Sequence, residues 1–273
     1  MRHLSLSQAW DETKAIIAHD GRLFISVALA LVALPAAITG LLSPKGVGSV
    51  ATPWWIDLVV VVASLIALTG QLALIRLALG PSITVGGAIA HGMRRLPIYF
   101  LSALLIVVAL FVAAIPFAVV LAALGVPLPA NNMQASTPAA IAALIYLALI
   151  CFVIVRMLMS APVASAEDTG PIAIIRRSWE LTAGNWWRLF AFVVMIFVAA
   201  LVLAIATRAA TGVVAQVLIG PVAPLSASAL VVAIVLALLN AGLTVFLAVM
   251  LARIYVQLAG RGGAAAGVPN IGI

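Results

Sequence analysis

Charged side chains are scarce in this sequence. Only 8% of its 273 residues are Asp, Glu, Lys or Arg, whereas 66% are hydrophobic. Typical soluble domains have about 25% charged residues and 45–50% apolar ones. The composition therefore excludes an ordinary soluble domain and indicates a membrane protein.

Groups that carry acid–base or metal chemistry are equally few. The chain has seven acidic residues and three histidines, His3, His19 and His91, which lack the spacing of metal ligands. No serine-hydrolase, phosphate-loop or dinucleotide-binding motif occurs. Glu167 and Asp168 are adjacent, which places them poorly as an opposed acid and base. The sequence thus predicts no enzyme, with no catalytic residue, cofactor or metal site.

The single cysteine, Cys151, excludes an intramolecular disulfide bond. It falls within a long apolar run, where we expect it to serve as a small packing residue.

Apolar runs long enough to cross a membrane dominate what is present. A helix needs about 20 apolar residues to span a hydrocarbon core of about 30 Å. The first run follows a segment containing Asp11, Glu12 and Asp20, so we interpret it as a retained span and not a signal peptide. Because no alternating strand pattern accompanies the runs, they predict an all-α integral membrane protein and not a barrel. Six runs qualify: Leu23–Leu42, Ile56–Leu77, Ile98–Leu124, Pro138–Met159, Leu189–Ala210 and Ala229–Tyr255.

Positive charge is distributed unevenly between the two sides of these predicted spans. Only Lys45 and Arg208 fall on the outer connections. This bias predicts that both termini face the cytoplasm. It also accounts for the net charge of +7 without nucleic acid, because the basic residues are tied to the ends of spans. The other twelve basic residues are Arg2, Lys14, Arg22, Arg76, Arg94, Arg95, Arg156, Arg176, Arg177, Arg188, Arg253 and Arg261.

An internal repeat organises the chain. Charged, helix-like segments at 9–24, 86–100 and 173–190 each precede an apolar hairpin. Each hairpin then ends near one arginine, in "IRLALGP", "VRMLMSAP" and "RIYVQLAG". We therefore predict one membrane domain over residues 1–273, built from three units of an interfacial helix plus a helical hairpin. The units cover approximately 1–80, 81–162 and 163–260, followed by a tail at 261–273.

The third charged segment carries most of the polar and aromatic residues. We expect Thr169 to cap a helix with Pro171 in its first turn, and Gly184-Asn185 to end it. An Arg176–Glu180 pair at i,i+4 should add a few tenths of a kcal/mol. Such a helix should lie in the interface plane, with Trp186, Trp187 and Arg188 anchoring the next span at headgroup level. One side of it is predicted to carry Ile172, Ile175, Trp179 and Thr182, and the other Arg176, Arg177 and Glu180.

This segment also resembles a known family. Glu167, Gly170-Pro171, Arg177-Ser178-Trp179 and Gly184-Asn185-Trp186-Trp187-Arg188-Leu189 resemble the glycerophosphoryl diester phosphodiesterase membrane-domain family of six-span bacterial membrane proteins. The resemblance implies a six-span layout and a bacterial inner membrane. Some members join this membrane part to a separate catalytic domain that this sequence does not contain, so the resemblance implies no activity.

Three arginines stand out as candidates for binding an anion. Arg76, Arg156 and Arg253 occupy equivalent places at the inner ends of the three hairpins. Together they would bind a phosphate-bearing headgroup through bidentate hydrogen bonds. Alternatively, each extends to the headgroups by itself or pairs with Glu167, Asp168, Glu180 or Asp20.

Within the spans, Gln71 and Asn240 are the notable polar residues. Amides buried in lipid usually bond across to a neighbouring helix, and the alternative is that they line a path for a solute.

The function expected from these features is non-enzymatic. We predict a role in membrane or envelope homeostasis in the bacterial inner membrane, through contact with lipid headgroups, including anionic phospholipid, or with a membrane-protein partner. A homo-oligomer is an open possibility. The alternative is a small transporter or channel for a lipid-like or anionic solute. That alternative requires a polar path joining Gln71, Asn240 and the three arginines, whereas the first reading requires a closed core.

Overall fold

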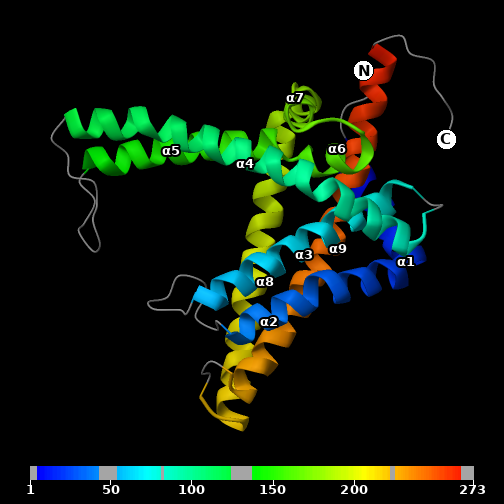
Figure 1. Ribbon diagram of the computed structural model, residues 1–273, viewed down its shortest axis with the longest axis vertical. Coiled ribbons are helices and arrows are strands. Elements are labelled where there is room, and N and C mark those ends of the chain that lie inside the picture. Colours follow the sequence, from blue (N-terminus) through cyan, green and yellow to red (C-terminus); the bar gives the residue numbers. More distant parts are fainter. Residues whose placement is uncertain (1–4, 43–53, 81–82, 124–136, 222–224, 266–273) are drawn as a thin grey trace.

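The computed structural model describes residues 5–42, 54–80, 83–123, 137–221 and 225–265, and within these ranges it contains helices and no strands (Figure 1). Lys45, one of the two basic residues predicted on the outer connections, lies outside these ranges. The prediction of an all-α chain is confirmed. The elements are α1 (Leu6–Ala28), the π-helix η1 (Leu29–Ala33), α2 (Leu34–Leu42), α3 (Trp54–Leu79), α4 (Val85–Ala123), α5 (Thr137–Arg156), α6 (Ser160–Ala166), α7 (Pro171–Thr182), α8 (Trp186–Leu218) and α9 (Ala227–Ala265).

In the described part of the chain, six helices are long and apolar enough to cross a membrane, which confirms the six predicted spans. All six are longer than predicted, the first and the third most of all. The first is continuous from Leu6 to Leu42 and the third from Val85 to Ala123, because the charged segments that precede these spans continue the same helix without a break. Only the third charged segment forms a separate helix, α7. Gly184, with φ +80, ends it in a conformation that favours glycine.

Proline has different effects in the first and the third span. In the first span the π-helical turn η1 comes just before Pro35, which has no N–H to donate and crowds the carbonyl four residues earlier. A wider turn at this place accommodates the proline. In the third span, α4 runs as one helix through Pro97 and Pro116.

The hydrophobic core lies where α1, α3 and α9 meet. Leu72, Leu74 and Ile75 of α3 are fully buried, as are Val249 and Ile254 of α9. These residues belong to the C-terminal parts of their helices, near Arg76 and Arg253. We call this part of the molecule, where Arg76, Arg156 and Arg253 lie, the basic end.

The three hairpins diverge away from the basic end (Figure 1). In this view α4 and α5 lie together and point to the left, while α8 and α9 run down the page. Far from the basic end, α4, α5 and α8 therefore expose large apolar side chains, such as Phe111 (74% exposed), Leu144 (64%) and Val217 (77%). Such surfaces are typical of helices that face lipid.

A close approach between α3 and α4 fixes the start of the second hairpin. Gly92 of α4 is buried, and a Cβ atom added there would lie 2.8 Å from the carbonyl oxygen of Thr69 in α3. Small residues permit this kind of backbone contact between membrane helices. The contact brings His91 and Arg95, on the same helix, to the connection between α6 and α7.

Candidate functional site

A short buried helix organises the basic end. All residues of α6 from Ser160 to Ser165 are buried, and α6 packs against α3, α4, α7 and α9. Its sequence, SAPVASA, consists of small residues that let the surrounding helices approach closely. We did not predict this helix. The segment that follows it, Glu167–Thr169, connects α6 to α7, and we call it the acidic loop.

Glu167 joins two helices that are distant in sequence. Its Oε1 accepts a hydrogen bond from Oη of Tyr255 in α9 at 2.8 Å and another from Nε of Arg177 in α7 at 3.2 Å. Burial lowers the pKa of Arg177, but the hydrogen bond and the charge of Glu167 raise that pKa by more, so it lies above its ordinary value. The carboxylate thus holds α7 against α9.

Two further helices bind at the end of α6. The carbonyl oxygen of Ser165 accepts a hydrogen bond from Nη1 of Arg76 in α3 at 3.1 Å, and Nε2 of His91 in α4 lies 3.1 Å from the same oxygen. The Ser165 hydroxyl donates to the carbonyl of Leu72 at 3.3 Å. These bonds attach α3 and α4 to the end of α6, next to the acidic loop.

Arg95 completes this set of contacts. Its side chain, 8% exposed, forms an ion pair with the exposed carboxylate of Asp168, and its Nη1 donates to the carbonyl of Thr169 at 3.5 Å. The predicted helix cap by Thr169 is wrong: Gly170 occupies the N-cap position, and the Thr169 hydroxyl is buried without a hydrogen-bond partner among the described residues. The chain turns here to place the Thr169 carbonyl toward Arg95, whereas Pro171 begins α7 as predicted.

Each arginine of the predicted trio donates to a different backbone carbonyl. Arg76 bonds to Ser165, Arg253 to Ala78 at 2.7 Å and Arg156 to Trp179 at 3.4 Å. The first two connect α3 to α6 and α9 to α3. Arg156 lies instead between α5 and α7.

No carboxylate pairs with any of these three arginines, although all seven acidic residues lie in the described ranges. Asp11 pairs with Lys14, Asp20 with His19, Asp168 with Arg95, and Glu167 and Glu180 pair with the arginines of α7. Glu12 accepts a hydrogen bond from Gln8, and Asp57 lies in the first turn of α3, at its other end. The expected alternative of pairing with an acid therefore does not occur for the trio.

Aromatic side chains surround Arg156. Its guanidinium carbon lies 5.3 Å from the ring centroid of Phe152 and 4.9 Å from that of Trp179, which are cation–π distances. Trp186 is stacked on Phe190, with centroids 5.0 Å apart, and meets Trp187 edge to face at 4.7 Å. At the start of α8, Asn185 occupies the N-cap position without a side-chain cap, and Arg188 and Trp187 are exposed.

Helix α7 packs against the protein through a face that we did not single out from the sequence. The Arg176–Glu180 pair forms, with 3.0 Å between Nε and Oε1. However, the buried positions are Ile174, Ser178, Leu181 and Thr182, whereas Ile172 is 73% exposed and Trp179 is 42% exposed. This inward face is partly polar, because Ser178 and Thr182 donate to the carbonyl of Arg156, at 2.7 and 3.4 Å.

The two amides within the spans lie in different surroundings. Gln71 is partly buried in α3, whereas Asn240 is exposed on α9, which buries Ala237 and Ala241 instead. Neither side chain bonds to another described residue, so the expected cross-helix hydrogen bonds do not form there. No metal-binding cluster of His, Cys, Asp or Glu occurs in the ranges that the structure covers.

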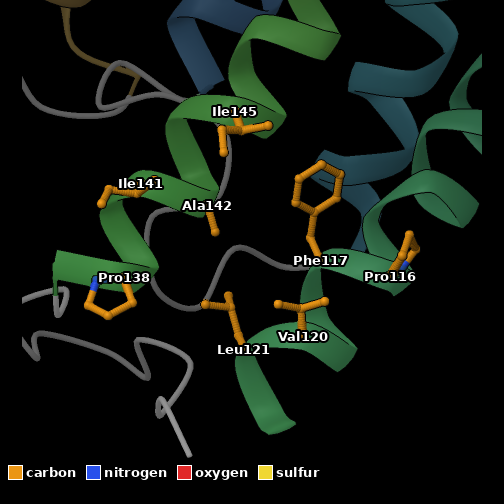
Figure 2. A pocket seen from close by; sticks show the side chains of 8 residues that line it. All are labelled: Pro116, Phe117, Val120, Leu121, Pro138, Ile141, Ala142 and Ile145. Atoms are coloured by element: carbon orange, nitrogen blue, oxygen red, sulfur yellow. The ribbon is translucent and has the colours of Figure 1, made fainter. Parts of the chain in front are cut away.

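Apolar grooves separate neighbouring helices. One of about 560 Å³ lies between α5 and α8, and Cys151 is among its lining residues. Another of about 430 Å³ lies far from the basic end, where Phe117 and Leu121 of α4 face Ile141 and Ile145 of α5 (Figure 2). A third of about 330 Å³ lies between the first span and α3. Side chains without charge line all three grooves, so their walls suit hydrocarbon.

Comparison with known proteins identifies the family but no characterised relative. No curated protein and no solved structure matches the chain. A family model described as a domain of unknown function, DUF7847, matches residues 4–258. The match takes in five spans and nearly all of the sixth, together with α7 and the acidic loop, and on this basis the chain belongs to the DUF7847 family of unknown function.

Proposed function

We propose that this chain is a non-enzymatic inner-membrane protein of bacteria that binds anionic lipid headgroups at its basic end, in support of membrane or envelope homeostasis. The observation that carries this proposal is the absence of any carboxylate partner for Arg76, Arg156 and Arg253 in the described structure. The resemblance to the glycerophosphoryl diester phosphodiesterase membrane-domain family stays a prediction.

The cost of burying these arginines without a counter-ion explains why they would bind a headgroup phosphate. A partly buried cation without a counter-ion is costly. One bond to a carbonyl uses only one of the five N–H donors of a guanidinium, and the Nε atoms of Arg156 and Arg253 are buried without partners. A phosphate oxygen supplies both the missing charge and strong acceptors.

A lipid-retention experiment tests this proposal. Arg76→Gln, Arg156→Gln and Arg253→Gln, singly and combined, should lower the number of phosphatidylglycerol molecules that stay bound in native mass spectrometry. Arg176→Gln is the matched control, because Arg176 is 82% exposed and already pairs with Glu180. Equal lipid retention in the combined variant and the wild type would refute headgroup binding by the trio.

Orientation is tested separately by labelling in whole cells. With Cys151 replaced by alanine, Lys14→Cys should react with a membrane-impermeant maleimide only after the cells are permeabilised. Leu225→Cys, 68% exposed at the opposite end of the spans, should react in intact cells. This pattern follows from the positive-inside rule, and the reverse pattern would place the basic end outside.

A further inference from the structure

The groove between α5 and α8 differs from the other two in what lies at its end. Its walls comprise Leu144, Ala148 and Phe152 of α5 and Trp186, Trp187 and Phe190 of α8. From Leu144 to Phe152 the groove follows α5 for eight residues, or about 12 Å. Arg156 lies one turn further along α5, with its guanidinium over the Phe152 ring. The groove is thus apolar along its length and cationic at one end.

Two donors at this end have no partner in the described structure. Trp186 carries a buried indole N–H without an acceptor, and the Nε–H of Arg156 is likewise buried without an acceptor. Unpaired buried donors are costly. An acceptor that enters between α5 and α8 would remove this cost, and tryptophan at a membrane interface typically binds at the level of lipid phosphate and ester groups.

We infer that one anionic phospholipid binds in this groove, with an acyl chain along Leu144–Phe152 and its phosphate at Arg156 and Trp186. The inference rests on the proposed function and assigns it a particular site. A cation at the end of a hydrocarbon-lined groove is the complement of an anionic amphiphile. The lining of this groove is uncharged, like that of the other two, and Arg156 distinguishes it by lying one turn beyond Phe152, with its guanidinium over that ring.

The groove can be closed without disturbing the core. Ala148 is exposed within it, so Ala148→Phe would fill the space of the acyl chain. Ala143→Phe is the matched control, because Ala143 is also exposed on α5 but does not line the groove. Arg156→Gln removes the charge, and the backbone carbonyl of Arg156 still accepts the bonds from Ser178 and Thr182.

The experiment is a titration of delipidated protein with phosphatidylglycerol and, separately, phosphatidylcholine, followed by native mass spectrometry. The wild type should retain one tightly bound phosphatidylglycerol. Ala148→Phe should lose it, Ala143→Phe should keep it, and Arg156→Gln should bind it at least about ten-fold more weakly, as expected when a charge-assisted hydrogen bond is lost. Phosphatidylcholine, which has the same chains but no net charge, should bind more weakly to the wild type.

The outcomes separate the groove from the general role of the basic end. If Ala148→Phe retains the lipid while the combined arginine variant loses it, the groove site is wrong and headgroup binding stands. If neither Ala148→Phe nor the arginine variants change retention, both proposals fail. If Ala148→Phe loses the lipid but Arg156→Gln binds phosphatidylglycerol and phosphatidylcholine as tightly as the wild type, the groove takes hydrocarbon alone and the anionic site is refuted.

Discussion

Gly92→Ala is expected to destabilise the folded protein by about 1–3 kcal/mol, the usual cost of overpacking a tight contact. The added Cβ would lie 2.8 Å from the carbonyl oxygen of Thr69 and 3.4 Å from the backbone nitrogen of Ala73. Both atoms belong to the backbone of α3, so no side chain can rotate to make room. The helices α3 and α4 must therefore separate, which would also move His91 and Arg95 away from the segment that follows α6.

Thermal unfolding in mild detergent measures this effect. Gly242→Ala is the matched control, because Gly242 is exposed in the middle of α9 and nothing lies within 4 Å of an added Cβ. There, alanine should leave the unfolding temperature unchanged or raise it, since alanine favours a helix over glycine by about 0.5–1 kcal/mol. Equal unfolding temperatures for the two variants would show that α3 and α4 are not in close contact at Gly92.

Glu167→Ala is expected to cost about 3 kcal/mol, because two hydrogen bonds to a charged group are lost together and each typically contributes about 1.5–3 kcal/mol. Tyr255, which is buried, would lose its acceptor, and Arg177 would keep, among the described residues, only its contact with Glu180. The partial exposure of Glu167 and Arg177, 27% and 33%, keeps the expected cost at the lower end of that range.

A double-mutant cycle isolates the hydrogen bond between Glu167 of the acidic loop and Tyr255 of α9. Glu167→Ala, Tyr255→Phe and the double variant should show a coupling energy of at least about 0.5 kcal/mol in unfolding experiments. Glu180→Ala is the control: Glu180 is 48% exposed and, within the described part of the chain, pairs only with arginines of its own helix, so its removal should cost less than about 1 kcal/mol. Additive effects of the Glu167 and Tyr255 changes would contradict the bond between them.

The spans could be predicted because hydrocarbon requires long apolar runs, and those are visible in the sequence alone. Helix α6 could not, because SAPVASA has neither the length nor the periodicity of a helix with an apolar face. It is helical because neighbouring helices enclose it. The inward face of α7 was missed for a related reason: Ser178 and Thr182 are buried by their bonds to the carbonyl of Arg156, not by their hydropathy.

In the candidate site, too, some features could be predicted from the sequence and others could not. The sequence indicated that Arg76, Arg156 and Arg253 are equivalent by position, but their partners depend on which helices adjoin each of them. Arg253 donates to Ala78, which is 175 residues away in the chain. Likewise, Glu167 and Tyr255 are 88 residues apart, and no local pattern connects them. Long-range pairings of this kind follow from the packing of the spans, which periodicity does not specify.

The central position of α9 has a consequence for biosynthesis. The first helix packs on the last: Trp10 meets Phe246 at 5.0 Å, Thr13 contacts Met250, and the backbone N–H of Ser5 bonds to Gln257. Translation proceeds from the N-terminus at about 5–20 residues per second, so α1 leaves the ribosome well before its partner is made. The first hairpin therefore enters the bilayer with its packing surface uncovered, and a nascent chain that stalls before α9 is inserted but not yet folded.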